Sequence, residues 1–296
     1  QADANFGGGL AYDNGLLFVS TGLGRVVAID PMRAQLVWEH DFKLPFRAAP
    51  SAADGRVFVI THDNQLFALD AKTGDTIWDH QVIVEGAGLL GNSSPAVQDD
   101  TLVAPFTSGE LVAIRVQNGR VAWQDILTRT GRLTSLSTLS DIAGRPVIDR
   151  GRVFAVSHSG RMVSIDLTTG ERVWTRNIAA TQTPWIAGDY VYVADGQQLK
   201  RSSDLSTWTN ITGGPAAAIT CLATDGYNVF VGYSGNGLKR TYTDVTTLAT
   251  YISGSETYTN AAYVKGRVMA SAGNDLANFT ADVTTSHSHT SGLISE

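Results

Sequence analysis

The chain has 296 residues, of which 43% are hydrophobic and 17% are charged, and its formal net charge is −6. That composition allows a large core and predicts a surface built mainly from uncharged polar residues. A mildly acidic chain without a Lys/Arg cluster argues against nucleic acid as a partner. No apolar run approaches the roughly 18 residues that a membrane span needs. The single cysteine, Cys221, excludes an intrachain disulfide and a multi-cysteine metal site.

The first part of the chain repeats one phrase four times. Each copy has a turn such as Asp54-Gly55, a short apolar run, a second run that usually ends in Asp, and a third run that carries a Trp. The runs are short and rich in β-branched residues, which predicts strands and not helices. The turn dipeptides favour hairpins, because Gly tolerates positive φ. The copies close at Trp38, Trp78, Trp123 and Trp174.

A fourth strand precedes each copy and is rich in small residues, as in 48–51 and 94–97. Four strands per repeat, with a period of about 40 to 50 residues, predict an all-β chain folded as a β-propeller. Three further copies open near Gly188, Asp225 and Lys265. We therefore predict a single propeller of about seven four-stranded blades, and eight blades is the rival count. The chain begins at Gln1 without a signal sequence, so we expect a mature or excised form.

Four phrases carry a resemblance to a known family. They are QLFALDAKTG at 65–74, SSPAV at 93–97, LSD at 139–141 and DLTTGERVW at 166–174. On these phrases, residues 7–195 resemble the BamB family of quinoprotein-like propellers, and we assign 1–195 to BamB-like blades of the single propeller 1–296. The resemblance implies a non-catalytic scaffold for protein–protein interaction in outer-membrane β-barrel assembly. It also implies a monomer in the periplasm, associated with the outer membrane, whose partner is a periplasmic domain of a BamA-like protein.

The resemblance implies partner-binding residues as well. In the family, loops on one face of the propeller contact the barrel-forming subunit, and this implies partner-binding roles for Leu89, Leu90 and Asp141. Leu89 and Asp141 match the family pattern. At Leu90 the family often has Arg, and at Ala143 it often has a second Asp.

The repeat sequence changes in the last third of the chain, residues 196–296. We expect the blades of this part to have a different origin and to join the BamB-like part near 194–198. The phrase at 200–208 resembles the Asp-box hairpin of sialidase-type propellers, and 225–240 resembles repeats of phage virion proteins. Two alternatives to the BamB-like function therefore stay open. One is a recombinant or chimeric propeller with no native function of its own. The other is a carbohydrate-binding or phage virion propeller.

Asp30, Asp70 and Asp166 occupy one equivalent place in their blades, which is typical of a short acid that hydrogen-bonds turn backbone. A general acid and base would break the repeat instead of following it. The repeated Trp residues are expected to wedge between neighbouring blades, because each can bury a large apolar area. Quinoprotein enzymes often bind their quinone with a vicinal disulfide, which one cysteine cannot form. We predict no catalytic residue, no cofactor and no metal.

Overall fold

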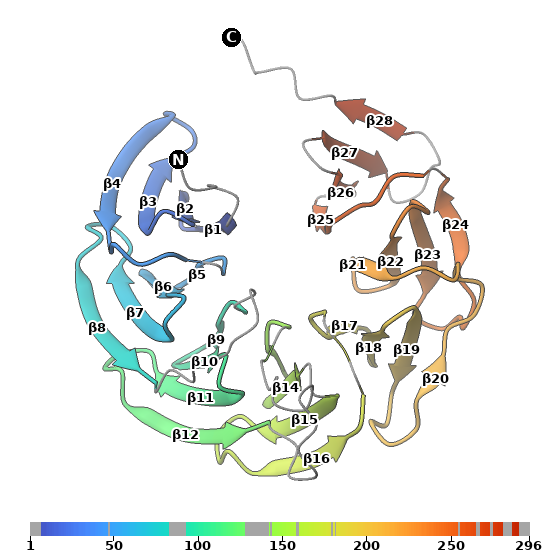
Figure 1. Ribbon diagram of the computed structural model, residues 1–296, viewed down its shortest axis with the longest axis horizontal. Helices are drawn as coiled ribbons and strands as arrows, with labels where there is room; N and C mark the ends of the chain where they lie inside the picture. Colours follow the sequence, from blue (N-terminus) through green and yellow to red (C-terminus); the bar gives the residue numbers. More distant parts are fainter. Residues whose placement is uncertain are drawn as a thin grey trace. The chain divides into compact units, whose positions relative to one another are not determined.

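The computed structural model describes residues 7–46, 48–82, 93–127, 142, 144–157, 160–178, 180, 182–253, 255–264, 267–272, 275–280 and 286–289. In these residues the chain forms seven antiparallel sheets of four strands each (Figure 1). The all-β, four-stranded blade architecture predicted from the repeats is confirmed, with seven blades in the described part of the chain. None of these residues belongs to a helix long and apolar enough to cross a membrane.

The chain divides into two compact units, Gln1–Ala179 and Ala180–Glu296. The first unit has four sheets, each formed by four consecutive strands. Its strands are β1 (Gly7–Asp13), β2 (Leu16–Thr21), β3 (Arg25–Asp30), β4 (Gln35–Asp41), β5 (Ser51–Ala53), β6 (Arg56–Ile60), β7 (Gln65–Asp70), β8 (Thr76–Gln81), β9 (Ala96–Gln98), β10 (Thr101–Pro105), β11 (Glu110–Arg115), β12 (Val121–Ile126), β13 (Val147–Asp149), β14 (Arg152–Ser157), β15 (Arg161–Asp166) and β16 (Arg172–Arg176).

The second unit has three sheets with the same strand order. Its first two sheets carry a buried apolar core between them, and a second core lies between its last two sheets. Its strands are β17 (Trp185–Ala187), β18 (Tyr190–Asp195), β19 (Gln198–Ser202), β20 (Thr209–Asn210), β21 (Ile219–Thr224), β22 (Asn228–Tyr233), β23 (Leu238–Tyr242), β24 (Ala249–Ile252), β25 (Asn260–Val264), β26 (Arg267–Ala272), β27 (Asp275–Thr280) and β28 (Ser286–His289).

Tight turns connect the strands within each sheet of the first unit. Asn14 and Gly15 have φ of +48° and +85°, and Asp54 and Gly55 have φ of +52° and +70°. Two successive residues with positive φ make the hairpin turn whose twist matches the strands on either side. The Asn-Gly and Asp-Gly dipeptides therefore lie where the sequence predicts hairpins.

An irregularity in register recurs between the third and fourth strands of every sheet in the first unit. In the first sheet it falls between Ala28 and Ile29, so that Trp38 lies opposite Ala28. The second, third and fourth sheets repeat it at the equivalent place. A bulge of this kind re-aims the side chains that follow it. Here it turns the Trp of each of the first three sheets toward the sheet that comes next in the chain.

The repeated Trp residues join neighbouring sheets of the first unit. Trp38 and Trp123 are buried, and the indole Nε1 of Trp38 donates a hydrogen bond to the carbonyl of Ala71 at 2.9 Å. Trp78 donates in the same way to Val116 at 2.9 Å, and Trp123 to Leu167 at 2.8 Å. The predicted wedging of Trp between blades is therefore confirmed for these three residues.

Candidate functional site

Three linkers leave the same end of the first unit's sheets. Each joins the outermost strand of one sheet to the innermost strand of the next, and they run over 42–50, 82–95 and 127–146. Because every sheet has the same up-and-down strand order, these linkers emerge on one side. We call this side, with its three linkers, the linker end. The second and third linkers are longer than the first, and loops of this length frequently carry function.

The three linkers begin with the same anchor. The backbone N–H of Phe42 donates to the carbonyl of Gly24, Val82 donates to Asn64, and Leu127 donates to Gly109. In each case the acceptor lies in the turn between the second and third strands of the same sheet. Val82 and Leu127 are also buried in the apolar cores between sheets. Each linker therefore leaves the sheet from a fixed point.

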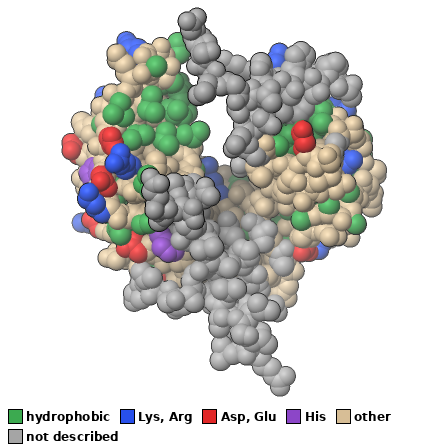
Figure 2. Space-filling model, turned by 45° about the horizontal axis from the view of Figure 1, so that its top comes forward, with side chains coloured by type: hydrophobic (Ala, Val, Ile, Leu, Met, Phe, Trp, Pro, Cys, Tyr) green, Lys and Arg blue, Asp and Glu red, His purple; other side chains and the backbone are tan. Residues whose placement is uncertain are grey.

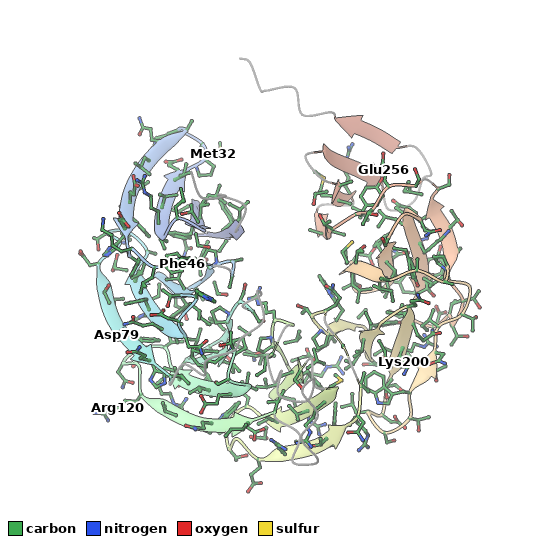
Figure 3. The ribbon with its side chains drawn as sticks, in the orientation of Figure 1. Met32, Phe46, Asp79, Arg120, Lys200 and Glu256 are labelled. Carbon is green, nitrogen blue, oxygen red and sulfur yellow. The ribbon has the colours of Figure 1, made fainter. Side chains whose placement is uncertain are left out.

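Phe46 secures the first linker. Its side chain is fully buried between the first and second sheets and packs edge-on against Phe42, with ring centroids 5.3 Å apart (Figure 3). His40 stacks on Phe42 at 4.3 Å and lies 3.2 Å from the carbonyl of Gly74 in the second sheet. The short linker is thus held against its own sheets by Phe46, while Phe42 and Leu44 are half-buried.

The two longer linkers are closed at their far ends as well. The carbonyl of Pro95 accepts a hydrogen bond from the Ser51 hydroxyl, so the second linker returns onto the innermost strand of the sheet before it. Ile142 is buried in the same core as Leu127, so the third linker returns to the core that it left. Both linkers start and finish on rigid elements, which is the usual arrangement for binding loops.

Asn64 joins two sheets at the linker end. It is fully buried and has φ of +62°. Its side-chain amide donates to the hydroxyl of Thr107 at 2.8 Å, and its side-chain oxygen accepts from the backbone N–H of Thr107 at 3.2 Å. A buried amide whose donor and acceptor are both used fixes the geometry around it. The base of the second linker is therefore pre-organised.

The described surface at the linker end carries several carboxylates. Asp63 accepts a hydrogen bond from the Thr61 hydroxyl, and Gln65 donates to Asp79 at 3.3 Å. Asp79 lies on the rim of the unit (Figure 3), and Glu110 begins the third strand of the next sheet. Lys43 and Arg145 lie on the first and third linkers, so the described charges at the linker end have both signs.

Leu89, Leu90 and Asp141, the predicted partner-binding residues, lie outside the described residues, as does Ala143. Leu89 and Leu90 belong to the second linker, and Asp141 belongs to the third. The structure therefore describes the two anchors of each linker and not the residues themselves.

The repeated acids lie at turns and accept hydrogen bonds from the backbone of those turns, as predicted. Asp70 accepts from the backbone N–H groups of Lys72 and Thr73, and these bonds hold the pKa of its carboxyl below the ordinary value. Asp30 and Asp166 make the same bonds in their own turns, and the same cause lowers their pKa values. Backbone donors stabilise the charged form of a carboxyl, which makes it a poor general acid or base at neutral pH.

The described residues were also searched for a metal site and for a reactive cysteine. There, no three His, Cys, Asp or Glu side chains gather into a group that could hold a metal ion. Cys221 is buried, and burial raises the pKa of its thiol to about 11, which keeps it protonated and unreactive. Burial also lowers the pKa of His80, which lies two residues after Trp78 in the sequence.

Comparisons with known proteins show the family and the fold of the chain. The family described as "Outer membrane protein assembly factor BamB" matches residues 1–216. The chain belongs to this family. The BamB of Nitrosomonas eutropha is 25% identical over 195 residues, which make up 66% of this chain and 47% of that relative. The chain thus spans about half the length of the curated relatives it matches.

Two solved structures show the likeness in fold. The crystal structure of BamB from Moraxella catarrhalis superposes with a TM-score of 0.80 at 19% identity, covering 90% of this chain and 82% of that one. The crystal structure of Saccharomyces cerevisiae Sqt1 superposes with a TM-score of 0.76 at 11% identity, covering 96% of this chain and 84% of that one. The predicted β-propeller fold and the predicted resemblance to BamB are both confirmed. The different origin of residues 196–296 remains a prediction.

Sequence reasoning missed the common anchor of the linkers. Phe42, Val82 and Leu127 each follow the end of an outermost strand by one residue. All three are apolar, and this is the signal that could have revealed them. It was hidden because the linkers differ in length, so the repeat loses its register directly after these residues.

Proposed function

We propose that this chain is a non-catalytic scaffold that acts in the periplasm, at the outer membrane, in the assembly of β-barrel proteins. Its partner in this proposal is a periplasmic domain of a BamA-like protein. The docking surface is the linker end, with Leu89 and Leu90 on the second linker and Asp141 on the third. The observation that carries the proposal is the family match over residues 1–216, which includes both linkers.

The anchors of the linkers support this assignment. A loop that is fixed at both ends loses less conformational entropy on binding than a free one does. Val82 and Pro95 hold the second linker, and Leu127 and Ile142 hold the third. The first linker is shorter, and Phe46 at its middle is fully buried between two sheets.

The decisive experiment measures binding of the whole chain to a purified BamA periplasmic domain by biolayer interferometry. Leu89→Glu should abolish binding, because it places a charge where an apolar contact is proposed. Met32→Glu is the matched control, because Met32 is 91% exposed and lies in a turn at the opposite end of its sheet. Absence of binding by the parent chain, or equal loss in both variants, would refute the proposal.

Leu90 and Ala143, where the chain departs from the family pattern, allow a test for tighter binding. Leu90→Arg and Ala143→Asp each restore the residue that the family often has. If the linkers are the docking surface, the two changes together should tighten binding to the BamA domain by roughly 10-fold, the scale of one or two rim charges. Unchanged affinity in the double variant would place the contact elsewhere on the propeller.

A further inference from the structure

Three Asn-Gly dipeptides lie in turns of the chain, at 14–15, 118–119 and 236–237. An asparagine followed by glycine can lose its side-chain amide spontaneously. The glycine backbone nitrogen attacks Cγ of the asparagine, the Cγ–Nδ2 bond breaks, and the displaced proton leaves with the nitrogen as ammonia. Water then opens the resulting succinimide at either carbonyl, which gives aspartate or isoaspartate. The attack needs a glycine nitrogen that can approach Cγ, so the hydrogen bonds of each turn control its rate.

The second dipeptide is held at both reacting groups. The backbone N–H of Gly119 donates to the carbonyl of Arg115 at 3.0 Å. The side-chain oxygen of Asn118 accepts from the N–H of Arg120 at 3.1 Å. Gly119 also lies beneath Trp78, because an added Cβ would be 3.0 Å from that ring. Bringing the glycine nitrogen to Cγ would break both hydrogen bonds, so this turn protects Asn118.

The third dipeptide is held by another segment of the second unit. Gly237 is buried, and its N–H donates to the carbonyl of Glu256 at 3.1 Å. The N–H of Asn236 donates to the carbonyl of Tyr233 at 3.2 Å, and its Nδ2 donates to the carbonyl of Ser234 at 2.8 Å. The nitrogen that would attack is therefore fixed here as well.

The first dipeptide lacks such bonds. Asn14 and Gly15 form the two-residue turn between β1 and β2, and Asp13 pairs with Leu16 on either side of them. In the described part of the first unit, the N–H of Gly15 donates no hydrogen bond, and a Cβ on Gly15 would meet no atom within 4 Å. The Asn14 side chain has one hydrogen bond there, from Nδ2 to the Asp13 carboxylate at 3.0 Å. That bond lies within the turn and moves with it.

We propose that Asn14 is a site of spontaneous modification, which the folded chain converts to isoaspartate and aspartate while Asn118 and Asn236 stay intact. All three are followed by the same residue, so the covalent chemistry is the same at each. The hydrogen bonds that distinguish the three sites each lie within one unit. The fold therefore selects one of three chemically equal sites.

The modification should loosen β1. Isoaspartate carries the main chain through Cβ and Cγ, which adds one carbon atom to a two-residue turn whose length fixes the register of the hairpin. In its sheet, β1 pairs with β2 alone, so it has no second strand to hold it. Figure 2 shows charged side chains of both signs scattered over the described surface in view, so one more carboxylate changes that surface little. The longer main chain is thus the larger perturbation.

Peptide mass spectrometry of the whole chain, incubated under mildly alkaline conditions, tests the proposal. Conversion is measured at each of the three asparagines by the gain of about one mass unit, and an isoaspartyl methyltransferase detects isoaspartate. The chain unfolded in guanidinium chloride supplies the intrinsic rate at each site. Relative to those rates, Asn14 in the folded chain should convert roughly 10-fold or more faster than Asn118 and Asn236, the factor expected for one hydrogen bond. Equal protection of all three sites, or faster conversion at Asn118 or Asn236, would overturn the proposal.

Hydrogen exchange of β1 tests the consequence of the modification. The chain that carries isoaspartate at position 14 should exchange faster in β1 than the unmodified parent. Asn14→Asp is the matched control, because it adds the same charge without lengthening the main chain, and it should exchange as the parent does. Equal exchange in the modified chain and the parent would refute the loosening of β1, and fast exchange in the control would assign it to charge.

Discussion

The two units join their sheets with different chemistry. In the first unit, a neutral indole N–H donates to a backbone carbonyl in the turn of the next sheet, and a Gly lies beneath the ring. In the second unit, Arg201 takes this part between the first two sheets. It is 7% exposed, donates to the carbonyl of Thr243 in the next sheet, and lies over the ring of Tyr190 at 4.3 Å. Tyr192 reaches the same carbonyl at 3.5 Å.

In both units a polar side chain links neighbouring sheets, and the residue that provides the link differs. In both units the acceptor is a backbone carbonyl in a turn or at its edge. The donor is an indole in one unit and a guanidinium stacked on an aromatic ring in the other. The second unit also has a repeat Trp, Trp208. Its Nε1 is buried without a hydrogen-bond partner among the described residues.

Replacing a linking Trp should have the largest effect. Trp123→Ala removes a buried ring and the hydrogen bond to Leu167, so we expect a loss of about 3–5 kcal/mol in the free energy of unfolding. Trp208→Ala should cost clearly less, because Trp208 is only half-buried and makes no such bond. Guanidinium unfolding of the two variants and the parent measures this difference. Equal losses would mean that the two units do not differ in how their sheets are joined.

The Gly beneath the Trp is the next test. Gly170 has φ of +76°, and a Cβ there would lie 2.5 Å from Trp123. Gly170→Ala should therefore cost about 2–4 kcal/mol, from left-handed backbone strain and from overpacking together. Gly55→Ala is the control, since Gly55 has φ of +70° and no atom within 4 Å of the added Cβ. It should show the backbone strain alone, about 1–2 kcal/mol. If both variants lose the same stability in urea, the contact with Trp123 contributes nothing.

The repeat made the first unit predictable. A tight turn before each second strand and a Trp in each fourth strand return in all four copies, and an Asp ends three of the four third strands. The blade count and the wedging of the Trp residues followed from this repeat. The role of the Gly beneath each ring could not be predicted in this way, because the contacts of Gly74 with Trp38 and of Gly170 with Trp123 join different blades.

The second unit and the candidate docking surface were less predictable for a common reason. Arg201 belongs to a phrase that looks like an Asp-box hairpin, and its role depends on a carbonyl more than forty residues along the chain. Leu89 and Asp141 were predicted from the resemblance to BamB and not from spacing. Contacts between distant residues of unlike type leave no periodic trace, so neither could be worked out from the repeat.

Arg201 offers a test within the second unit. Arg201→Ala should cost about 1–3 kcal/mol, because it removes the stacking on Tyr190 and leaves the carbonyl of Thr243 without this donor. Arg201→Lys should recover only part of the loss, since an ammonium group lacks the planar surface that stacks on the ring. Urea unfolding followed by Tyr and Trp fluorescence gives both values. A Lys variant as stable as the parent would show that charge alone, without stacking, joins these sheets.

The smallest effect is expected at the turn acids, which the two units share. Asp70 in the first unit and Asp204 in the second each accept two backbone N–H groups of their own turn, and these bonds lower the pKa of both carboxyls from the ordinary value of 3.8. A carboxyl whose pKa is lower in the folded chain adds stability above pH 3.8 and loses it as the pH falls through the lowered value. Asp70→Ala and Asp204→Ala should therefore be mildly destabilising at pH 7, and each difference from the parent should shrink below pH 3.8. Thermal unfolding of the three chains from pH 7 down to pH 3 follows this difference. A gap that stays constant with pH in one unit would mean that the carboxylate there does not stabilise its turn, and that the units differ in their turns as well as in the contacts between their sheets.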